Sequence, residues 1–188
     1  MAVILVAIAA GALSSCSGNA PTSGATSSTV HQPSFNQADT EFVLAAGQHL
    51  GRTLTAAQLA ETASASPRVQ AFAHDLIKLK GRQVDQIAAW LDEWGRQGAD
   101  FGHDSHVDSA VEPKDGLTDV TLSRLATVRG RRFDRLFIAA MTVHLGAGRA
   151  IWTAEAAGGR NPAATQLAQR LVVEEADLAQ RARTVLAP

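Results

Sequence analysis

The chain has no tyrosine, a single cysteine and no excess of basic residues over its 188 positions. A formal net charge of −1 leaves no electrostatic footprint for nucleic acid or for anionic lipid. Cys16 stands alone, which excludes an intramolecular disulfide. The sequence also lacks a phosphate loop, a nucleophile elbow and any Glu-x-x-His pair of the kind a di-iron helical oxidase needs. We therefore predict a protein that is not an enzyme and does not bind nucleic acid.

The N-terminus is predicted to direct export, with residues 1–15 as a signal peptide. Its apolar run, Val3–Ala10, is shorter than the roughly 20 residues that span a bilayer, and it precedes small residues. The ending Leu13-Ser14-Ser15-Cys16 resembles a bacterial lipobox, in which cleavage precedes the cysteine and lipid joins its thiol. Residues 16–34 would then be the lipidated Cys16 and a flexible Ser/Thr/Gly/Pro-rich tether. We expect an exported domain held at the membrane by lipid. A plain cleaved signal peptide and a buried structural helix are the alternatives.

The rest of the chain, residues 35–188, carries apolar residues at helical spacing. The first long helix is expected to run from a cap at Asn36 or Asp39 to about residue 64. Further long helices are expected over about 67–95, 131–157 and 162–186, and a short one over about 118–128. Ser66-Pro67 and Asn161-Pro162 each combine an N-cap residue with a proline suited to the first helical position. A polar loop over residues 97–116 separates the second helix from the short one.

An internal repeat organises this helical region. The stretch FVLAAGQHLG at 42–51 recurs 95 positions later as FIAAMTVHLG at 137–146, with a histidine in register. The same offset relates the second long helix to the last one. Each copy is a helical hairpin with an apolar face that it cannot bury alone. We therefore predict an all-α, ferritin-like four-helix bundle built from two repeated helical hairpins around a pseudo-twofold axis.

Equivalent inner positions of the two copies should approach each other across that axis. His49 is expected near His144, either as a metal site between helices or as a pair of core histidines satisfied by hydrogen bonds. Lys80 is expected near Glu175, because an ammonium on an inner stripe needs a partner. The alternative is that both side chains extend along the surface so that their charged ends reach solvent. In the loop, His103 and His106 stand at His-x-x-His spacing beside aspartates, a pattern that fits either a weak zinc or copper site or a solvated loop.

Several motifs in residues 35–186 resemble the bacterial family called "domain of unknown function 305". They are Phe35–Asp39, Gly130–Phe137 followed by Met141 and His144, and the pairs Trp90-Leu91 and Trp94-Gly95. The resemblance implies a ferritin-like four-helix fold, export, and copper binding in some members. The family pattern is Met-Ile-x-His-His followed by Gln-x-x-Glu-Ile-x-x-Met in each repeat, and imidazole and thioether both suit copper.

Only part of that ligand pattern is present in this chain. His49, Met141 and His144 remain, whereas leucine replaces the second histidine of both repeats, and Lys80 and Glu175 replace the later glutamines. The resemblance implies copper as the cofactor and these three side chains as its ligands. We therefore expect a cell-envelope lipoprotein that binds or handles copper weakly. The alternative is a structural or interaction lipoprotein, with an envelope protein as partner, that has lost the metal site.

Overall fold

The computed structural model describes residues 34–97, 99 and 116–187, all of which lie in the second of the chain's two compact units, Pro33–Pro188. The described part contains five helices and no strand. They are α1 Gln37–Ala63, α2 Pro67–Arg96, α3 Asp119–Thr127, α4 Gly130–Gly158 and α5 Pro162–Val185. The predicted all-α fold is confirmed. Asn36, one of the two predicted caps, begins the first helix, and the other predicted helix ends lie within one residue of the observed ones.

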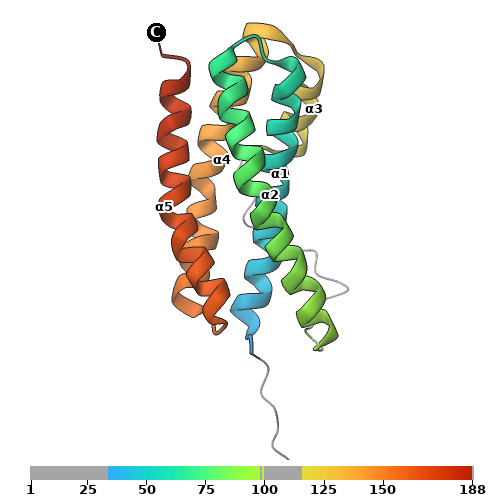
Figure 1. Cartoon of the computed structure of the whole chain (residues 1–188), viewed down its shortest axis with the longest axis vertical. Helices are drawn as coiled ribbons and strands as arrows, with labels where there is room; N and C mark the ends of the chain where they lie inside the picture. The colour runs from blue at the N-terminus through green and yellow to red at the C-terminus, as the bar shows by residue number, and fades with distance from the viewer. Residues whose placement is uncertain (1–33, 98, 100–115, 188) are drawn as a thin grey trace, which may run out of the picture. The chain divides into compact units, whose positions relative to one another are not determined.

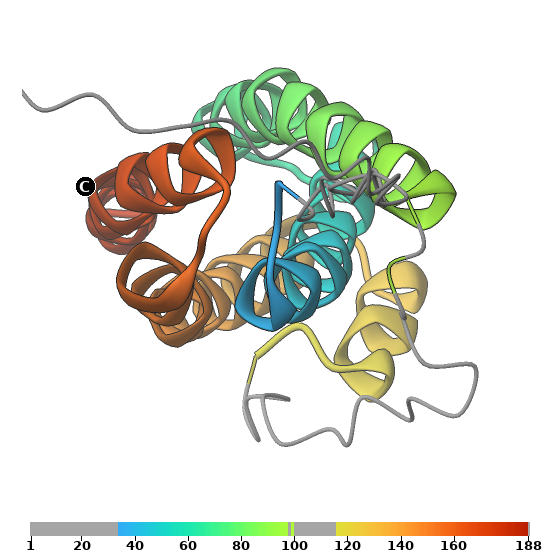
Figure 2. The same cartoon turned by 90° about the horizontal axis from the view of Figure 1, so that it is seen from below.

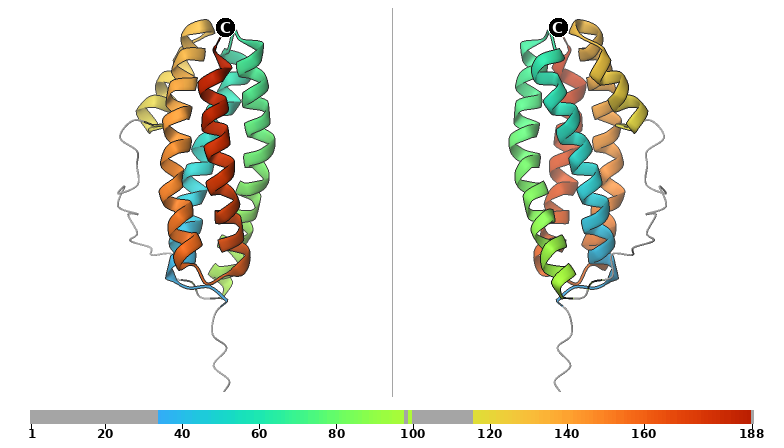
Figure 3. Two further views of the ribbon diagram at one scale, coloured as in Figure 1. Left: turned by 90° about the vertical axis from the view of Figure 1, so that its left-hand side faces the viewer. Right: turned by 90° about the vertical axis from the view of Figure 1, so that its right-hand side faces the viewer.

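The four long helices run side by side along one axis, and α3 lies outside them (Figure 1, Figure 2). α1 packs against α2 and α4, and α4 packs against α5, whereas the backbones of α2 and α5 make few contacts. The short α3 leans against α1 and α4 near one end of the bundle (Figure 3). The first helices of the two hairpins therefore form the central contact. α4 has the length and hydropathy of a membrane span, but its inner side chains are buried by α1 and α5.

Local capping explains where the helices begin. Asn36 and Asp39 form a reciprocal capping box at α1. At α2 the Ser66 hydroxyl accepts a hydrogen bond from the backbone N–H of Val69, and at α5 the Asn161 side chain accepts hydrogen bonds from two backbone N–H groups. Both capping residues are followed by a proline in the first turn of the helix. In the described part of the chain no side chain caps α4, which starts at Gly130, whose φ of 64° favours glycine.

Two equivalent aspartates fasten the two hairpins to each other. Asp39 of α1 accepts the backbone N–H groups of Arg160 and Asn161, in the turn between α4 and α5, at 3.0 and 2.9 Å. Asp134, its counterpart at the start of α4, accepts the Ser64 hydroxyl, in the turn between α1 and α2, at 2.5 Å. Each hairpin thus holds the turn of the other, which explains why an aspartate recurs at both positions.

The core consists of two apolar clusters with a polar layer between them. One cluster includes Phe72, Phe133, Phe137 and Leu178 together with α3's Leu125. The other surrounds the aromatic side chains near the opposite end. Between them along the helices lie buried polar side chains from all four long helices: His49, Thr53, Lys80, Gln83, His144 and Glu175. This buried polar layer is the candidate site.

Candidate functional site

The two repeated histidines meet face to face at the middle of the bundle. The ring centroids of His49 on α1 and His144 on α4 are 3.9 Å apart and the rings are tilted by only 9°. The side chains are 5% and 2% exposed. His144 Nε2 lies 3.1 Å from the carbonyl oxygen of His49. Because a carbonyl only accepts, Nε2 of His144 carries the proton and its Nδ1 holds the lone pair.

Glu175 on α5 is the centre of the layer's hydrogen bonding. Its Oε1 accepts from the Lys80 ammonium at 2.9 Å, and its Oε2 accepts from Trp152 Nε1 at 2.7 Å. His49 Nε2 is also 3.2 Å from Oε2, within ion-pair distance but without the alignment of a hydrogen bond. The indole of Trp152 meets the His49 ring edge-on, at 5.2 Å between centroids. A carboxylate that is 2% exposed thus accepts hydrogen bonds from two helices, α2 and α4, and lies within ion-pair distance of a histidine on α1.

Lys80 on α2 joins this layer to the outer part of α5. Its ammonium is fully buried and contacts Glu174 at 2.8 Å as well as Glu175 at 2.9 Å. Gln83, one turn along α2, donates to both oxygens of Glu174 at 2.9 and 3.0 Å. These side chains cross the gap between α2 and α5, where the backbones make few contacts. The ion pairs therefore link two helices whose backbones make few contacts.

A glycine on α4 makes room for the carboxylate. A β-carbon added at Gly148 would lie 2.3 Å from Glu175 Oε2, 2.8 Å from His49 Nε2 and 2.8 Å from Trp152 Nε1. Real β-carbons essentially never approach other atoms closer than 3.0 Å. Only glycine fits at this position while the layer keeps its arrangement.

Burial and neighbouring charges fix the protonation of the layer. Burial, reinforced by His49, lowers the pKa of His144 to about 3, so this imidazole is neutral at neutral pH. Burial alone would raise the pKa of Glu175, but His49 and Lys80 outweigh it and hold that pKa at about 2. Glu175 is therefore a carboxylate in the folded protein and Lys80 has a permanent counter-charge.

The histidine arrangement does not suit one shared metal ion. An imidazole binds a metal along an in-plane lone pair at about 2.0–2.1 Å. Two rings stacked 3.9 Å apart in nearly parallel planes direct these lone pairs along separate planes. The buried Lys80 ammonium on the same carboxylate adds electrostatic repulsion toward a cation. Among the described residues, no group of three His, Cys, Asp or Glu side chains is placed to hold a metal.

Of the other predicted ligands, Met141 alone lies within the described residues. Met141 is fully buried in the apolar cluster of Phe133 and Phe137, one helical turn before His144. His103, His106 and Cys16 lie outside the described residues. The structure thus brings together His49 with His144 and Lys80 with Glu175, and it assigns Met141 to apolar packing.

Four further residues of the layer were not predicted as site residues: Gln83, Gly148, Trp152 and Glu174. A second buried acid also escaped prediction. Glu155 on α4 is 1% exposed, and neither of its oxygens has an aligned hydrogen-bond partner among the described residues. Burial and the adjacent Asp39 raise its pKa to about 8. The helical spacing of Gly148, Trp152 and Glu155 on the inner face of α4 was the signal that could have located them.

Comparison with known proteins places this bundle in a structural context. Residues 39–186 match the family described as "Domain of unknown function (DUF305)", as the sequence motifs predicted. A DUF305 fragment from Deinococcus radiodurans shares 22% identity at a TM-score of 0.68, covering 82% of this chain and 98% of that one. A DUF305 protein from Streptomyces coelicolor shares 19% identity at a TM-score of 0.67, covering 80% and 91%.

A third solved structure with this fold has a bound metal. It is described as CopM in the Cu(I)-bound form, and it shares 18% identity at a TM-score of 0.60, covering 78% of this chain and 93% of that one. No curated protein matches the chain. At these identities the likeness concerns the fold alone.

Proposed function

The chain belongs to the DUF305 family, and we propose that it is an exported, membrane-tethered, non-catalytic bundle whose buried polar layer joins the two hairpins instead of holding copper. The observation that carries this proposal is the Lys80 ammonium, fully buried at 2.9 Å from Glu175. Both carboxylate oxygens of Glu175 already accept hydrogen bonds. A layer that has its own buried cation needs no metal to balance its charge.

Export and anchoring rest on the N-terminal sequence. The apolar run before Leu13-Ser14-Ser15-Cys16 supports cleavage by a lipoprotein signal peptidase, and the Ser/Thr/Gly-rich stretch supports a tether. Expression in a bacterial host with radiolabelled palmitate tests this proposal. Wild type should be labelled and partition with membranes, whereas Cys16→Ala should be unlabelled. Equal labelling of the two proteins would contradict it.

The absence of an interhelical copper site is tested by Cu(I) competition against a chromogenic chelator. The full chain carrying Cys16→Ala is used, because a free thiolate is itself a soft Cu(I) ligand. We expect the chelator to keep its copper, and His49→Gln or His144→Gln to change nothing in this assay. Stoichiometric uptake of Cu(I) that both histidine substitutions abolish would refute the structural role.

Copper binding is the second candidate, and one feature of the layer favours it. Nδ1 of His144 is buried and neutral and has no hydrogen-bond partner within the described residues, and Met141 lies one turn away on the same helix. A lone imidazole and a thioether are the ligand types that Cu(I) accepts, and the Cu(I)-bound CopM structure has this fold.

Substitutions distinguish the sources of any copper binding. Met141→Leu removes the thioether with little change in packing, because methionine and leucine have similar volumes. If copper uptake is found and Met141→Leu weakens it, the interhelical site is supported. If uptake survives Met141→Leu and His144→Gln but is lost in His103→Asn/His106→Asn, copper binds at the loop histidines.

A further inference from the structure

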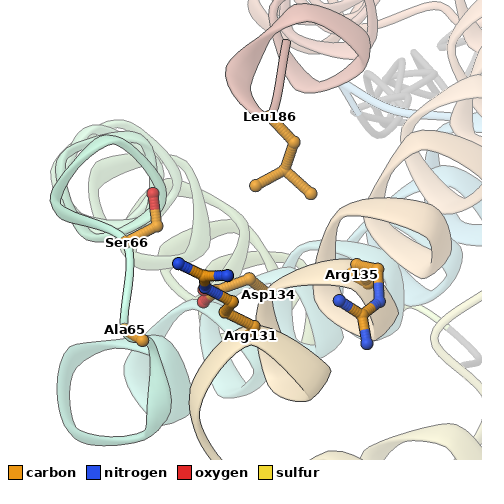
Figure 4. A pocket seen from close by; sticks show the side chains of 6 residues that line it. All are labelled: Ala65, Ser66, Arg131, Asp134, Arg135 and Leu186. Atoms are coloured by element: carbon orange, nitrogen blue, oxygen red, sulfur yellow. The ribbon is translucent and has the colours of Figure 1, made fainter. Parts of the chain in front are cut away.

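A second polar site lies at one end of the bundle, away from the buried layer. A cavity of about 560 Å³ opens where the α1–α2 turn, the start of α4 and the end of α5 meet (Figure 4). It is lined by Ala65, Ser66, Arg131, Asp134, Arg135 and Leu186. Its volume is in the range of small-molecule sites, roughly 300–1,000 Å³.

Two guanidinium groups line this cavity without a counter-charge of their own. Arg131 and Arg135 are one turn apart on α4, and Figure 4 shows both side chains at the cavity on the α4 side. Within the described part of the chain neither has a hydrogen bond or an ion pair. An arginine fork matches the oxygens of phosphate and carboxylate groups in geometry as well as charge.

The cavity's other donors add to this positive character. The Ser66 hydroxyl accepts from the backbone of Val69, which leaves its own hydrogen free to donate. No side chain among the described residues caps the N-terminus of α4, and its first turn contains no acidic residue to oppose the positive end of the helix dipole. One acid is present, Asp134, but it is 3% exposed and its Oδ1 accepts the Ser64 hydroxyl at 2.5 Å. Among the described residues that line the cavity, two cations thus stand against one engaged carboxylate.

We propose that this cavity binds a phosphate group, held by Arg131 and Arg135 with the Ser66 hydroxyl as a further donor. The cavity exceeds a bare phosphate ion in size, and Leu186, which is 40% exposed, offers an apolar wall. The ligand class that fits is therefore a phosphomonoester with a small organic body. The phosphate can belong to a soluble molecule or to a phospholipid that ends in a phosphomonoester, as phosphatidic acid does.

The position of the cavity favours the soluble source. α1 begins at one end of the bundle, and the cavity adjoins the turn after α1, at the other end (Figure 1). A domain tethered through the residues before α1 would thus carry this cavity at the end remote from its point of attachment.

Titration of the full chain carrying Cys16→Ala with phenyl phosphate and with inorganic phosphate, followed by calorimetry at constant ionic strength, tests the site. A parallel arm measures co-sedimentation with phosphatidic acid–phosphatidylcholine vesicles. We expect phenyl phosphate to bind, and Arg131→Gln or Arg135→Gln to weaken binding about tenfold or more, since each removes a charge-assisted hydrogen bond. Arg132→Gln is the matched control, because Arg132 is an exposed arginine on the same helix that does not line the cavity.

Each outcome decides the proposal. Binding of phenyl phosphate that depends on Arg131 and Arg135 but not on Arg132 supports a soluble ligand. Vesicle binding with the same dependence, without binding of phenyl phosphate, supports a headgroup. Equal losses of affinity in all three variants would show that binding depends on general positive charge and would overturn the proposal. The absence of binding in both arms would overturn it as well. Circular dichroism of each variant verifies that its helices are intact.

Discussion

Replacing Gly148 with alanine sets two opposing effects of known size against each other. In a helix interior, alanine is favoured over glycine by about 1 kcal/mol. Gly148 lies within α4, so propensity alone predicts that Gly148→Ala stabilises the protein. The structure predicts the opposite, because the new methyl group would lie 2.3 Å from Glu175 Oε2.

The surroundings of that oxygen decide which effect prevails. Glu175 is held at 2.7 Å by the buried Trp152 indole and at 2.9 Å by the buried Lys80 ammonium, so it cannot move aside without breaking these contacts. Overpacking costs about 1–3 kcal/mol, and separating a buried ion pair costs about 3–5 kcal/mol. We therefore expect Gly148→Ala to lower the free energy of unfolding by about 2 kcal/mol or more.

Urea unfolding followed by circular dichroism measures this loss, and Gly146→Ala provides the control. Gly146 lies two residues earlier on α4, and a β-carbon there meets nothing within 4 Å. We expect Gly146→Ala to raise the free energy of unfolding by up to about 1 kcal/mol. Equal stabilisation by both substitutions would show that the layer is loose and would refute the packing argument.

Three further substitutions follow from the same geometry. Lys80→Met leaves the buried Glu175 without its ammonium and should cost about 3–5 kcal/mol in urea unfolding, a loss that Glu175→Gln in the same chain should partly reverse; no recovery would contradict the pairing. Glu155 has a pKa of about 8 in the folded protein and of about 4.5 when unfolded. Its contribution to the free energy of unfolding is therefore complete below about pH 4.5 and is lost as the pH rises to about 8. For His144, whose pKa is lowered from 6.5 to about 3, the free energy of unfolding rises with pH instead, and this rise ends at about pH 6.5. Between pH 6.5 and 8 the free energy of unfolding should therefore fall by about 1.4 kcal/mol per unit, and Glu155→Gln should flatten that slope; an unchanged slope would exclude Glu155 as its cause. Asp134→Ala removes the acceptor of the Ser64 hydroxyl and should cost about 1–3 kcal/mol, whereas a loss as small as that of an exposed aspartate such as Asp92→Ala would count against the interhairpin contact.

The sequence predicted the helices well because their ends are set by local chemistry. Ser66-Pro67 and Asn161-Pro162 are caps that work through neighbouring backbone groups, independently of the rest of the fold. The repeat then predicted which helices face each other. Both kinds of information are present within short stretches of chain, so they can be recognised without a structure.

The details of the polar layer could not be predicted in the same way. Gly148 and Trp152 correspond through the repeat to Thr53 and Ala57, so neither residue has a like counterpart from which its role could be inferred. Proximity of the two histidines follows from the repeat, but the stacking of their rings depends on side-chain rotation. That rotation is fixed by a carbonyl, an indole and a carboxylate from different turns and helices.

The opposite charges at the two equivalent positions also determine which hairpins can pack together. Lys80 and Glu175 occupy the same position in the two repeats, and each neutralises the other at 2.9 Å in the middle of the bundle. Two copies of the first hairpin packed together would bury two ammonium groups against each other, and two copies of the second would bury two carboxylates. Because an unpaired or like-charged buried group is costly, these alternative pairings are disfavoured and only the mixed pair is satisfied. The exchange of a neutral position for two opposite charges thus fits a layer whose role is to join one hairpin specifically to the other.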